Sequence, residues 1–218
     1  MDVVIVGGHG KIALRLAKLL ADRGDRVRGL IRNRAHAADL EEQGAEPVLC
    51  DVEATEDISE HVAGADTVVF AAGAGPGSGP ERKRTVDYGA AAKLIEACQA
   101  TGVRRYLMIS AMSVDRPDRW SEQMRPYFEA KRDADEALVA AGLDHTIVRP
   151  GGLTDRPDTG LVEVGMPLDH SGQIPRDDVA ATLLACLDEP GMVGLTFDLI
   201  GGETPIAEAI ASLAAGRS

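Results

Sequence analysis

Short apolar runs alternate with amphipathic segments along the whole chain. Seven runs predict strands: VVIV (3–6), RVRGLI (26–31), EPVLC (46–50), DTVVFAA (66–72), RRYLMIS (104–110), DHTIVR (144–149) and LTFDLI (195–200). Most of these runs are continuously apolar rather than alternating. That pattern is typical of strands covered on both faces, as in a parallel sheet.

Segments with apolar residues on one helical stripe lie between the strands, at 11–23, 82–101, 125–141, 177–188 and 205–214. The alternation predicts an α/β fold: a Rossmann-type, doubly wound parallel sheet of about seven strands with helices on both faces and right-handed crossovers. We find no linker that would divide the chain, so residues 1–218 are expected to form a single domain.

Two Gly- and Pro-rich stretches predict loops. They are GAGPGSGP (73–80) and PGGLTDRPDTG (150–160), and each follows a predicted strand directly. Both loops therefore belong at the carboxyl edge of the sheet, where ligands bind in this architecture.

Charge and composition narrow the possible partners. The 218 residues are 44% hydrophobic and 27% charged, with a formal net charge of −12. An acidic surface is a poor partner for a phosphate backbone, so we expect no nucleic acid to bind. No apolar run approaches the ~18 residues of a membrane span, and the start, MDVVIVGG, lacks the basic and apolar regions of a signal peptide. These features favour a cytoplasmic protein without a membrane partner, either a monomer or a homodimer.

The three cysteines, Cys50, Cys98 and Cys186, lie far apart in apolar stretches. They are expected to be buried, reduced thiols. No Cys or His pair has the spacing of metal ligands, so no metal site is predicted.

The segment VVIVGGHGKIA reads as strand, tight turn and helix. Its glycines fit two overlapping patterns, Gly8-x-Gly10-x-x-Ala13 and Gly7-x-x-Gly10-x-x-Ala13. A glycine allows positive φ at the turn, and Gly10 has no Cβ to obstruct a pyrophosphate. The helix that follows offers free N–H groups and its positive dipole end. This first βα unit therefore predicts dinucleotide binding, with His9 contributing its backbone N–H more than its imidazole.

The end of the second predicted strand bears on the choice of dinucleotide. NAD-binding proteins usually have an acid there, but this chain has Arg32, Asn33 and Arg34. Guanidinium groups pair well with a 2′-phosphate, so NADP is favoured over NAD. The alternative is a pair of solvated arginines. Asp51, after the third strand, either accepts a hydrogen bond from the adenine amino group or caps the next helix.

Several motifs together resemble those of the short-chain dehydrogenase/reductases, and most of all their small atypical NAD(P)-binding branch, which is epimerase- or dehydratase-like. They are the glycine loop, Asp51, AAGAG (71–75), TVDYGAAAKLIEACQATGVRRYLMIS (85–110), Tyr127-x-x-x-Lys131, TIVRPGGLTD (146–155) and IPRDDVA (174–180). The cofactor-binding residues expected on the motifs and on this resemblance are Gly7, His9, Gly10, Lys11, Ile12, Arg32, Asn33, Arg34, Asp51, Val52, Ala71, Ala72, Gly73, Lys131 and Pro150.

The resemblance implies that Tyr127 is the general acid/base and that Lys131 binds the nicotinamide ribose and lowers the tyrosine pKa. Helical spacing puts Tyr127 and Lys131 on one face with Ala134 and Leu138, and a lysine on an inward face needs a polar partner. The alternative is a lysine that extends to solvent beside a packed tyrosine.

The third catalytic residue of the family, a Ser or Thr at the end of strand five, aligns with Ala111. Ser110 is the candidate substitute, although on an extended strand it points the other way. The following stretch contains Trp120 and several arginines. It either borders an anionic or flat substrate or is an ordinary loop with one packed Trp.

Residues 151–218 leave room only for a small cap on the substrate side. The expected function is that of an NADP-dependent oxidoreductase acting on a small carbonyl or hydroxyl compound. Two alternatives stay open: a non-catalytic NADP-binding redox sensor, and a flavin or quinone reductase that does not need the tyrosine.

Overall fold

The computed structural model describes residues 1–75 and 77–216, and over these residues the main sheet has nine strands in the order β11-β8-β10-β6-β5-β4-β1-β2-β3. The strands from β3 to β10 in this order are parallel. They are β1 (Asp2–Val6), β2 (Arg26–Ile31), β3 (Glu46–Leu49), β4 (Thr67–Phe70), β5 (Arg105–Ile109), β6 (Asp144–Pro150) and β10 (Leu195–Gly201). These are the seven strands that the apolar runs predict, and the Rossmann-like α/β fold is confirmed.

Four short strands have no counterpart in the sequence prediction. Strands β8 (Leu161–Gly165) and β11 (Thr204–Pro205) add an antiparallel edge next to β10. Strands β7 (Gly152–Thr154) and β9 (Gln173–Pro175) pair with each other in a separate two-stranded sheet. The stretch 150–160, predicted as a loop, therefore contains β7. In the other predicted loop, Pro76 lies outside the described residues.

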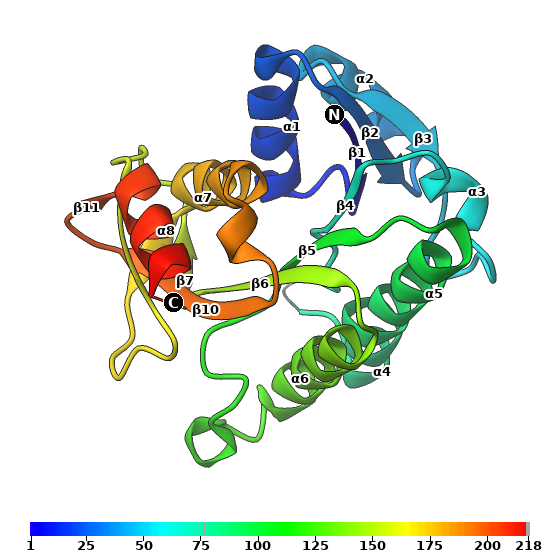
Figure 1. Cartoon of the computed structure of the whole chain (residues 1–218). Helices are drawn as coiled ribbons and strands as arrows, with labels where there is room; N and C mark the ends of the chain where they lie inside the picture. Colours follow the sequence, from blue (N-terminus) through cyan, green and yellow to red (C-terminus); the bar gives the residue numbers. More distant parts are fainter. Residues whose placement is uncertain (76, 217–218) are drawn as a thin grey trace.

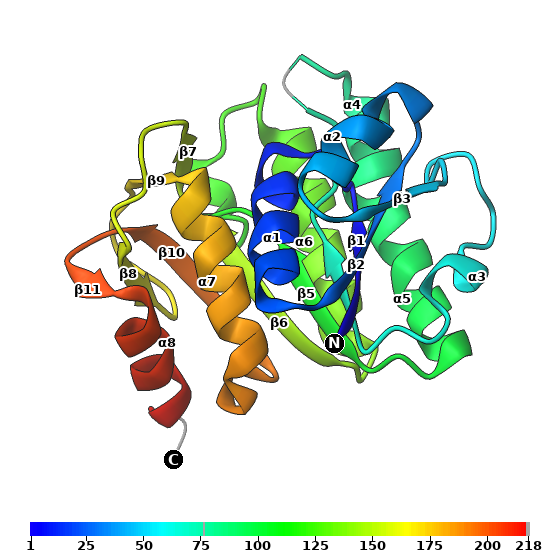
Figure 2. The ribbon, with the colours of Figure 1, turned by 90° about the horizontal axis from the view of Figure 1, so that it is seen from above.

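Helices cover both faces of the sheet (Figures 1 and 2). One face packs against α1 (Lys11–Arg23), α2 (Ala37–Glu42), α7 (Arg176–Asp188) and α8 (Ile206–Ala215). The other packs against α3 (Ser59–Val62), α5 (Ala91–Thr101) and α6 (Arg125–Ala140). The predicted helix 82–101 is three consecutive pieces: α4 (Pro80–Arg82), the π-helix η2 (Lys83–Ala90) and α5. Three short 3₁₀ turns complete the set: η1 (Arg34–His36), η3 (Pro117–Arg119) and η4 (Pro190–Met192).

Each central strand contributes to two hydrophobic cores. In β1, Val3 and Ile5 belong to the core under α1 and α7, whereas Val4 and Val6 belong to the core under α5 and α6. Successive side chains of a strand point to opposite faces, so a strand covered on both sides must be apolar throughout. This is the physical reason for the continuous apolar runs.

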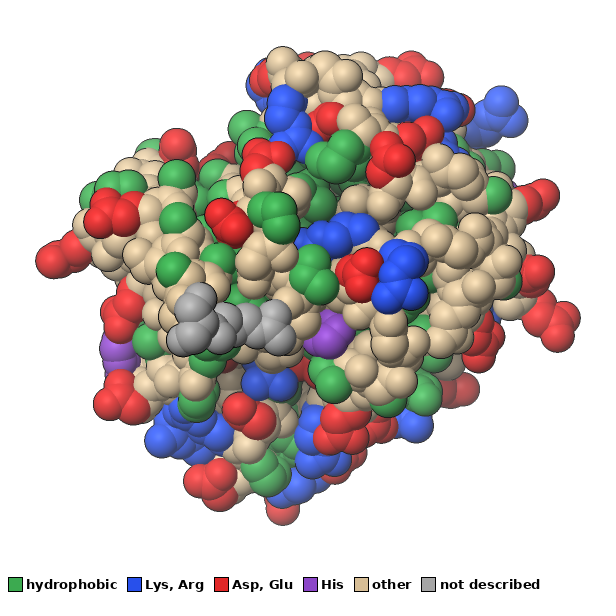
Figure 3. All heavy atoms as spheres, in the orientation of Figure 1, with side chains coloured by type: hydrophobic (Ala, Val, Ile, Leu, Met, Phe, Trp, Pro, Cys, Tyr) green, Lys and Arg blue, Asp and Glu red, His purple; other side chains and the backbone are tan. Residues whose placement is uncertain are grey.

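The segment after residue 150 does more than cap the sheet, because it supplies β10, β8 and β11 to the sheet and α7 and α8 to its face. Acidic and basic side chains are interspersed over the surface shown in Figure 3. Among the described residues, no helix combines the length and the apolar character needed to cross a bilayer. The carboxyl ends of β1, β2, β3 and β4 lie side by side, and the candidate site is at that edge.

Candidate functional site

The glycine turn between β1 and α1 forms the floor of a pocket. Gly7 has φ +80°, and a Cβ there would lie 2.7 Å from backbone atoms of Ala72. A Cβ on Gly8 would lie 2.8 Å from Gly29 Cα, so this glycine allows β1 and β2 to approach each other. Gly10 is the N-cap of α1, and no side chain caps this helix end. The first N–H groups of α1 therefore remain available to an anion.

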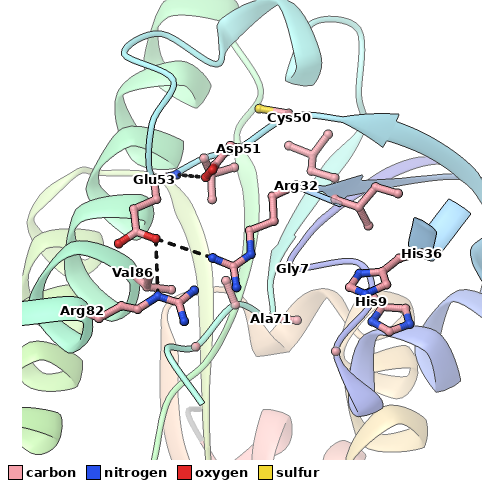
Figure 4. Close-up of a pocket in the computed structure, with 16 residues that line it drawn as sticks. Gly7, His9, Arg32, His36, Cys50, Asp51, Glu53, Ala71, Arg82 and Val86 are labelled. Atoms are coloured by element: carbon pink, nitrogen blue, oxygen red, sulfur yellow. Dashed lines mark hydrogen bonds and ion pairs between the residues drawn. The ribbon is translucent and has the colours of Figure 1, made fainter. Parts of the chain in front are cut away.

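The pocket extends from this turn across the ends of four strands, with a cavity volume of about 310 Å³ (Figure 4). Nine predicted cofactor residues line it: Gly7, His9, Gly10, Arg32, Asp51, Val52, Ala71, Ala72 and Gly73. The tight glycine cradle and the uncapped helix end fit a dinucleotide diphosphate. The lining residues follow the ends of β1, β2, β3 and β4, the edge of the sheet at which a dinucleotide binds in this architecture.

Two arginines from different elements point into the pocket and share one carboxylate. Arg32 Nη1 lies 3.9 Å from Glu53 Oε2, and Arg82 Nε lies 3.6 Å from the same atom (Figure 4). Arg32 follows β2 and Arg82 ends α4. The two guanidinium groups form a small cationic wall that Glu53 neutralises only in part.

A pair of stacked imidazoles borders the same pocket. The rings of His9 and His36 lie 3.6 Å apart at 11° (Figure 4). His9 Nε2 is 2.6 Å from Asp39 Oδ2. His9 is therefore more than a backbone spacer, because its ring fixes the turn after β1 against η1 and α2. The role of its backbone N–H toward a diphosphate stays a prediction.

Asp51 is held in a turn of its own. Its Oδ1 accepts hydrogen bonds from the backbone N–H groups of Glu53 (3.0 Å) and Ala54 (3.4 Å). The next helix, α3, begins only at Ser59, so Asp51 caps this turn and not a helix. Its side chain is half-buried at the pocket. The proposed contact with adenine is still open.

Lys131 is buried with two polar partners. The side chain is about 5% exposed, and Nζ donates to the carbonyl of Ile109 at 3.1 Å and lies 3.3 Å from Asp87 Oδ1. Asp87 is fully buried on η2, and its Oδ2 accepts the Ala74 N–H at 3.2 Å. The carboxylate thus connects the loop after β4 to α6. An ammonium group has three donors, so one donor of Lys131 remains for a ligand.

Tyr127 lies one helical turn before Lys131 and is half-buried. Burial raises the pKa of its phenol above the ordinary value, Asp87 and Asp135 raise it further, and Lys131 lowers it. The effect of Lys131 on the pKa of Tyr127 is downward, as the resemblance implies. The net shift of this pKa is upward, because the cost of burying the phenolate is larger. At neutral pH the phenol is therefore protonated and suited to donating a proton.

The end of β5 has no exposed hydroxyl group. Ser110 is 4% exposed, and its hydroxyl lies beside the buried carboxylate of Asp135, whose pKa it lowers. Nearby, Asp135 has its pKa raised by burial, and Arg149, with Nε 3.0 Å from Asp135 Oδ2, opposes that shift. Ala111 is also buried, at 8% exposed. A catalytic role for Ser110 is still a prediction, and its hydroxyl lies in a buried polar group with Asp135.

The remaining predicted cofactor residues do not line the pocket. Lys11 pairs through Nζ with Asp155 Oδ2 at 2.7 Å, and Ile12 is packed in the core. Asn33 caps η1 by accepting the Ala35 N–H at 3.0 Å, and Arg34 is exposed on η1. Pro150 ends β6 and is buried.

Sequence reasoning missed several residues of the site. Arg82, Glu53, His36, Cys50 and Val86 line the pocket, and Asp87 partners Lys131. The sequence offered only a weak signal for one of them: Asp87 lies at a position of a predicted amphipathic helix where a charged residue is otherwise unexpected.

The stretch between β5 and α6 contains a packed tryptophan. Trp120 is 7% exposed, donates from Nε1 to the Ser113 carbonyl at 2.8 Å and stacks on Phe128 at 5.5 Å. Phe128 meets the Tyr127 ring edge-on at 5.3 Å. The packed-Trp alternative is thus correct for Trp120 itself. Within the described residues, no group of three His, Cys, Asp or Glu side chains is arranged to hold a metal ion.

Comparison with known proteins agrees with this geometry. A family model for NAD(P)H-binding proteins matches residues 7–190. A curated relative from Bacillus subtilis, named uncharacterized sugar epimerase YhfK, is 42% identical over 98% of this chain and 100% of its own length.

Two solved structures are similar over nearly the whole chain. One, from Bacillus halodurans, is described provisionally as an NAD-dependent epimerase/dehydratase, with a TM-score of 0.93, 36% identity and coverage of 97% of this chain and 99% of that one. The other is the oxidoreductase ylbE from Lactococcus lactis, with a TM-score of 0.84, 27% identity and coverage of 99% and 97%. The protein therefore belongs to the NAD(P)H-binding family of Rossmann-fold proteins.

Proposed function

We propose that this protein is an NADP-dependent oxidoreductase that acts on a small carbonyl or hydroxyl compound. The observation on which this mainly depends is the buried ammonium group of Lys131, one helical turn from a protonated phenol at Tyr127. A buried lysine with a free donor is costly unless a ligand or the chemistry uses it.

The proton chemistry follows from this arrangement. A bound nicotinamide would supply or take up hydride. In the reductive direction the Tyr127 hydroxyl donates a proton to the oxygen of the substrate, and its raised pKa keeps it protonated until it is used. Lys131 stabilises the phenolate that results by its charge and binds a ribose hydroxyl through its third donor. Asp87 holds the ammonium in position.

The cofactor preference is inferred from Arg32 and Arg82. A 2′-phosphate is a dianion that pairs well with two guanidinium groups. It would compete with Glu53 for both arginines. The pocket supports Arg82 in the role that the sequence suggested for Arg34, because Arg34 does not line it.

Cofactor titration tests this preference. We expect Arg32→Ala and Arg82→Ala each to weaken NADPH binding about tenfold to a hundredfold, the effect of losing a charge-assisted hydrogen bond. NADH binding should be nearly unchanged, and Arg34→Ala is the matched control that should alter neither. Equal losses for NADPH and NADH in both variants would contradict NADP specificity.

Turnover tests the reaction. NADPH oxidation would be measured against a panel of aldehydes, quinones and flavins. We expect Tyr127→Phe to lower kcat about a hundredfold or more while NADPH binding is retained, since only the proton donor is lost. Tyr88→Phe removes a half-buried phenol from η2 and should leave kcat unchanged.

A second candidate function is reduction of a flavin or quinone without the tyrosine. It is favoured by the absence of an exposed hydroxyl at the end of β5, where Ser110 and Ala111 are both buried. Full turnover by Tyr127→Phe with a quinone or flavin acceptor would support this candidate over the first.

A further inference from the structure

The ammonium group of Lys83 lies beside Tyr127 without an anion to neutralise it. Its Nζ is 5.4 Å from the centroid of the Tyr127 ring. The side chain begins η2 and is half-buried. Over residues 1–75 and 77–216, this nitrogen has neither a hydrogen-bond acceptor nor a carboxylate at ion-pair distance.

The other four lysines of the chain all have such partners. Lys11 pairs with Asp155, Lys18 with Asp22 and Lys131 with Asp87, whereas Lys93 donates to the carbonyls of Val52, Glu53 and Thr55. Acidic residues outnumber basic ones by 35 to 23, so a neutralising partner for a lysine is easy to find in this chain. Among the five lysines, Lys83 thus differs in having no such partner within the described residues.

A second cation lies nearby, on the exposed side chain of Arg125. The Arg125 guanidinium lies 5.9 Å from the Trp120 ring and makes no ion pair within the part of the chain that the structure describes. Trp120, Phe128 and Tyr127 follow each other in ring contact. Two cations without counter-ions thus flank the aromatic group that ends at the catalytic phenol. From the buried side, the phenol is faced by Lys131 and by the carboxylates of Asp87 and Asp135.

Lys83 is not among the residues that line the cofactor pocket, whereas its neighbour Arg82 is. A substrate that hydrogen-bonds to the Tyr127 hydroxyl would lie next to the same ring that Lys83 contacts, so the ammonium is within reach of a second group on a small substrate. A half-buried cation has lost part of its hydration, and the charge-assisted hydrogen bonds of an anionic ligand compensate for that loss.

We propose that the substrate is a carbonyl compound that bears a carboxylate, and that Lys83 is the residue that binds this carboxylate. The proposal rests on the function proposed for Tyr127. It deepens that function by naming the charge class of the substrate and the residue that selects it.

Binding of a matched pair of probes tests the proposal without turnover. Benzoate and benzamide have nearly the same shape and differ in charge, and the chain has a single tryptophan, Trp120, whose fluorescence reports ligands near Phe128 and Tyr127. We expect the wild type to bind benzoate about tenfold more tightly than benzamide, or roughly 1.4 kcal/mol. Lys83→Gln should remove the difference, and Lys83→Arg should keep it.

Two controls separate this role from others. Lys18→Gln changes the net charge equally at an exposed pair on α1 and should leave the preference intact. NADPH affinity should be the same in Lys83→Gln as in the wild type.

In turnover, the ratio of kcat/KM for para-carboxybenzaldehyde over para-carbamoylbenzaldehyde should fall about tenfold in Lys83→Gln, which corresponds to the same 1.4 kcal/mol.

The proposal is overturned if the wild type binds benzoate and benzamide equally, or if Lys83→Gln weakens NADPH as much as benzoate. The second result would assign Lys83 to the cofactor. A wild type that binds no NADPH would contradict the proposed function instead, and the benzoate measurement on cofactor-free protein would still decide the role of Lys83.

Discussion

Lys131 and Asp87 form an ion pair that is almost completely removed from water, with 5% and 1% of the two side chains exposed. Two buried charges are tolerated only when they neutralise each other and their remaining donors and acceptors are used. Here the carbonyl of Ile109 accepts a second donor of Lys131 and the N–H of Ala74 donates to Asp87, which leaves the third donor of the ammonium for a ligand. The pair therefore stabilises the fold and holds the ammonium near Tyr127 at the same time.

Asp87→Asn should destabilise the protein by roughly 3 kcal/mol, because it leaves the buried ammonium without a counter-charge. The negative charge of Asp87 also raises the pKa of Tyr127, so its removal should lower that pKa. Proton donation requires the protonated phenol. The alkaline limb of the rate profile for NADPH oxidation should therefore move to lower pH. Denaturant unfolding and the pH dependence of kcat measure the two effects.

Asp22→Asn is the matched control. It breaks the exposed pair with Lys18, which has 59% and 63% of the two side chains exposed. Such a pair contributes at most about 1 kcal/mol, and it is far from Tyr127. Equal destabilisation by the two substitutions, or an alkaline limb that stays in place in Asp87→Asn, would contradict the role given to Asp87.

At the scale of elements, the turn between β1 and α1 and the π-helix η2 create the site. Gly7 allows the turn to adopt positive φ and to approach the backbone at Ala72. The π-helical segment η2 follows Arg82, which lines the cofactor pocket, directly. It contains Asp87, the partner of Lys131, and Lys83, the proposed partner of the substrate carboxylate. Segments of π-helix often occur at functional sites because they alter the direction of side chains.

Gly7→Ala should abolish cofactor binding and destabilise the protein by more than the strain of positive φ alone. That strain is about 1–2 kcal/mol for a non-glycine residue. The Cβ at position 7 would add a clash at 2.7 Å with the backbone of Ala72. Thermal unfolding and NADPH titration measure both effects.

Gly24→Ala gives the comparison for that prediction. Gly24 has φ +90° at the C-cap of α1, and a Cβ there would meet no atom within 4 Å. We expect a loss of about 1 kcal/mol with unchanged NADPH binding. If Gly7→Ala behaved like Gly24→Ala in both assays, the close contact with Ala72 would be irrelevant to the site.

The sequence predicted the longer elements better than the short ones, and the reason is their periodicity. Residues 11–23 coincide with α1, and each of the seven runs predicted as strands contains one. Helices α2 and α3 have six and four residues, too few for a helical stripe to be visible. Strands β7, β9 and β11 are two or three residues long, and none of them offers a pattern.

At the scale of the whole molecule, the two ends of the chain share one core. Val3 and Ile5 of β1 belong to the same cluster as Phe197 and Leu199 of β10 and Ile210 of α8. This shared core supports the prediction of a single domain over residues 1–218.

Thiol labelling tests the single domain. Cys98 lies in the core under α5 and α6 and Cys186 in the core under α1 and α7. Burial raises the pKa of each thiol to about 12, so the native protein has almost no reactive thiolate at neutral pH. In a Cys50→Ser background, both thiols should react only through unfolding, at equal rates that increase in parallel with denaturant. Much faster labelling of Cys186 would indicate that the C-terminal part opens separately.

The sequence by itself determined the parallel α/β sheet, the glycine turn and the Tyr127–Lys131 pair. Each of these is encoded locally: by continuous apolar runs, by glycines at a strand–helix turn, and by four-residue spacing on one helix face. Only the tertiary structure brought Arg82 to Arg32, Asp87 to Lys131 and Lys83 to Tyr127. These partners are far apart in the chain, and their contacts depend on how η2 packs between the strand ends and α6. That packing depends on the two hydrophobic cores on either face of the sheet, which form from residues distant in sequence. No local pattern along the chain predicts it.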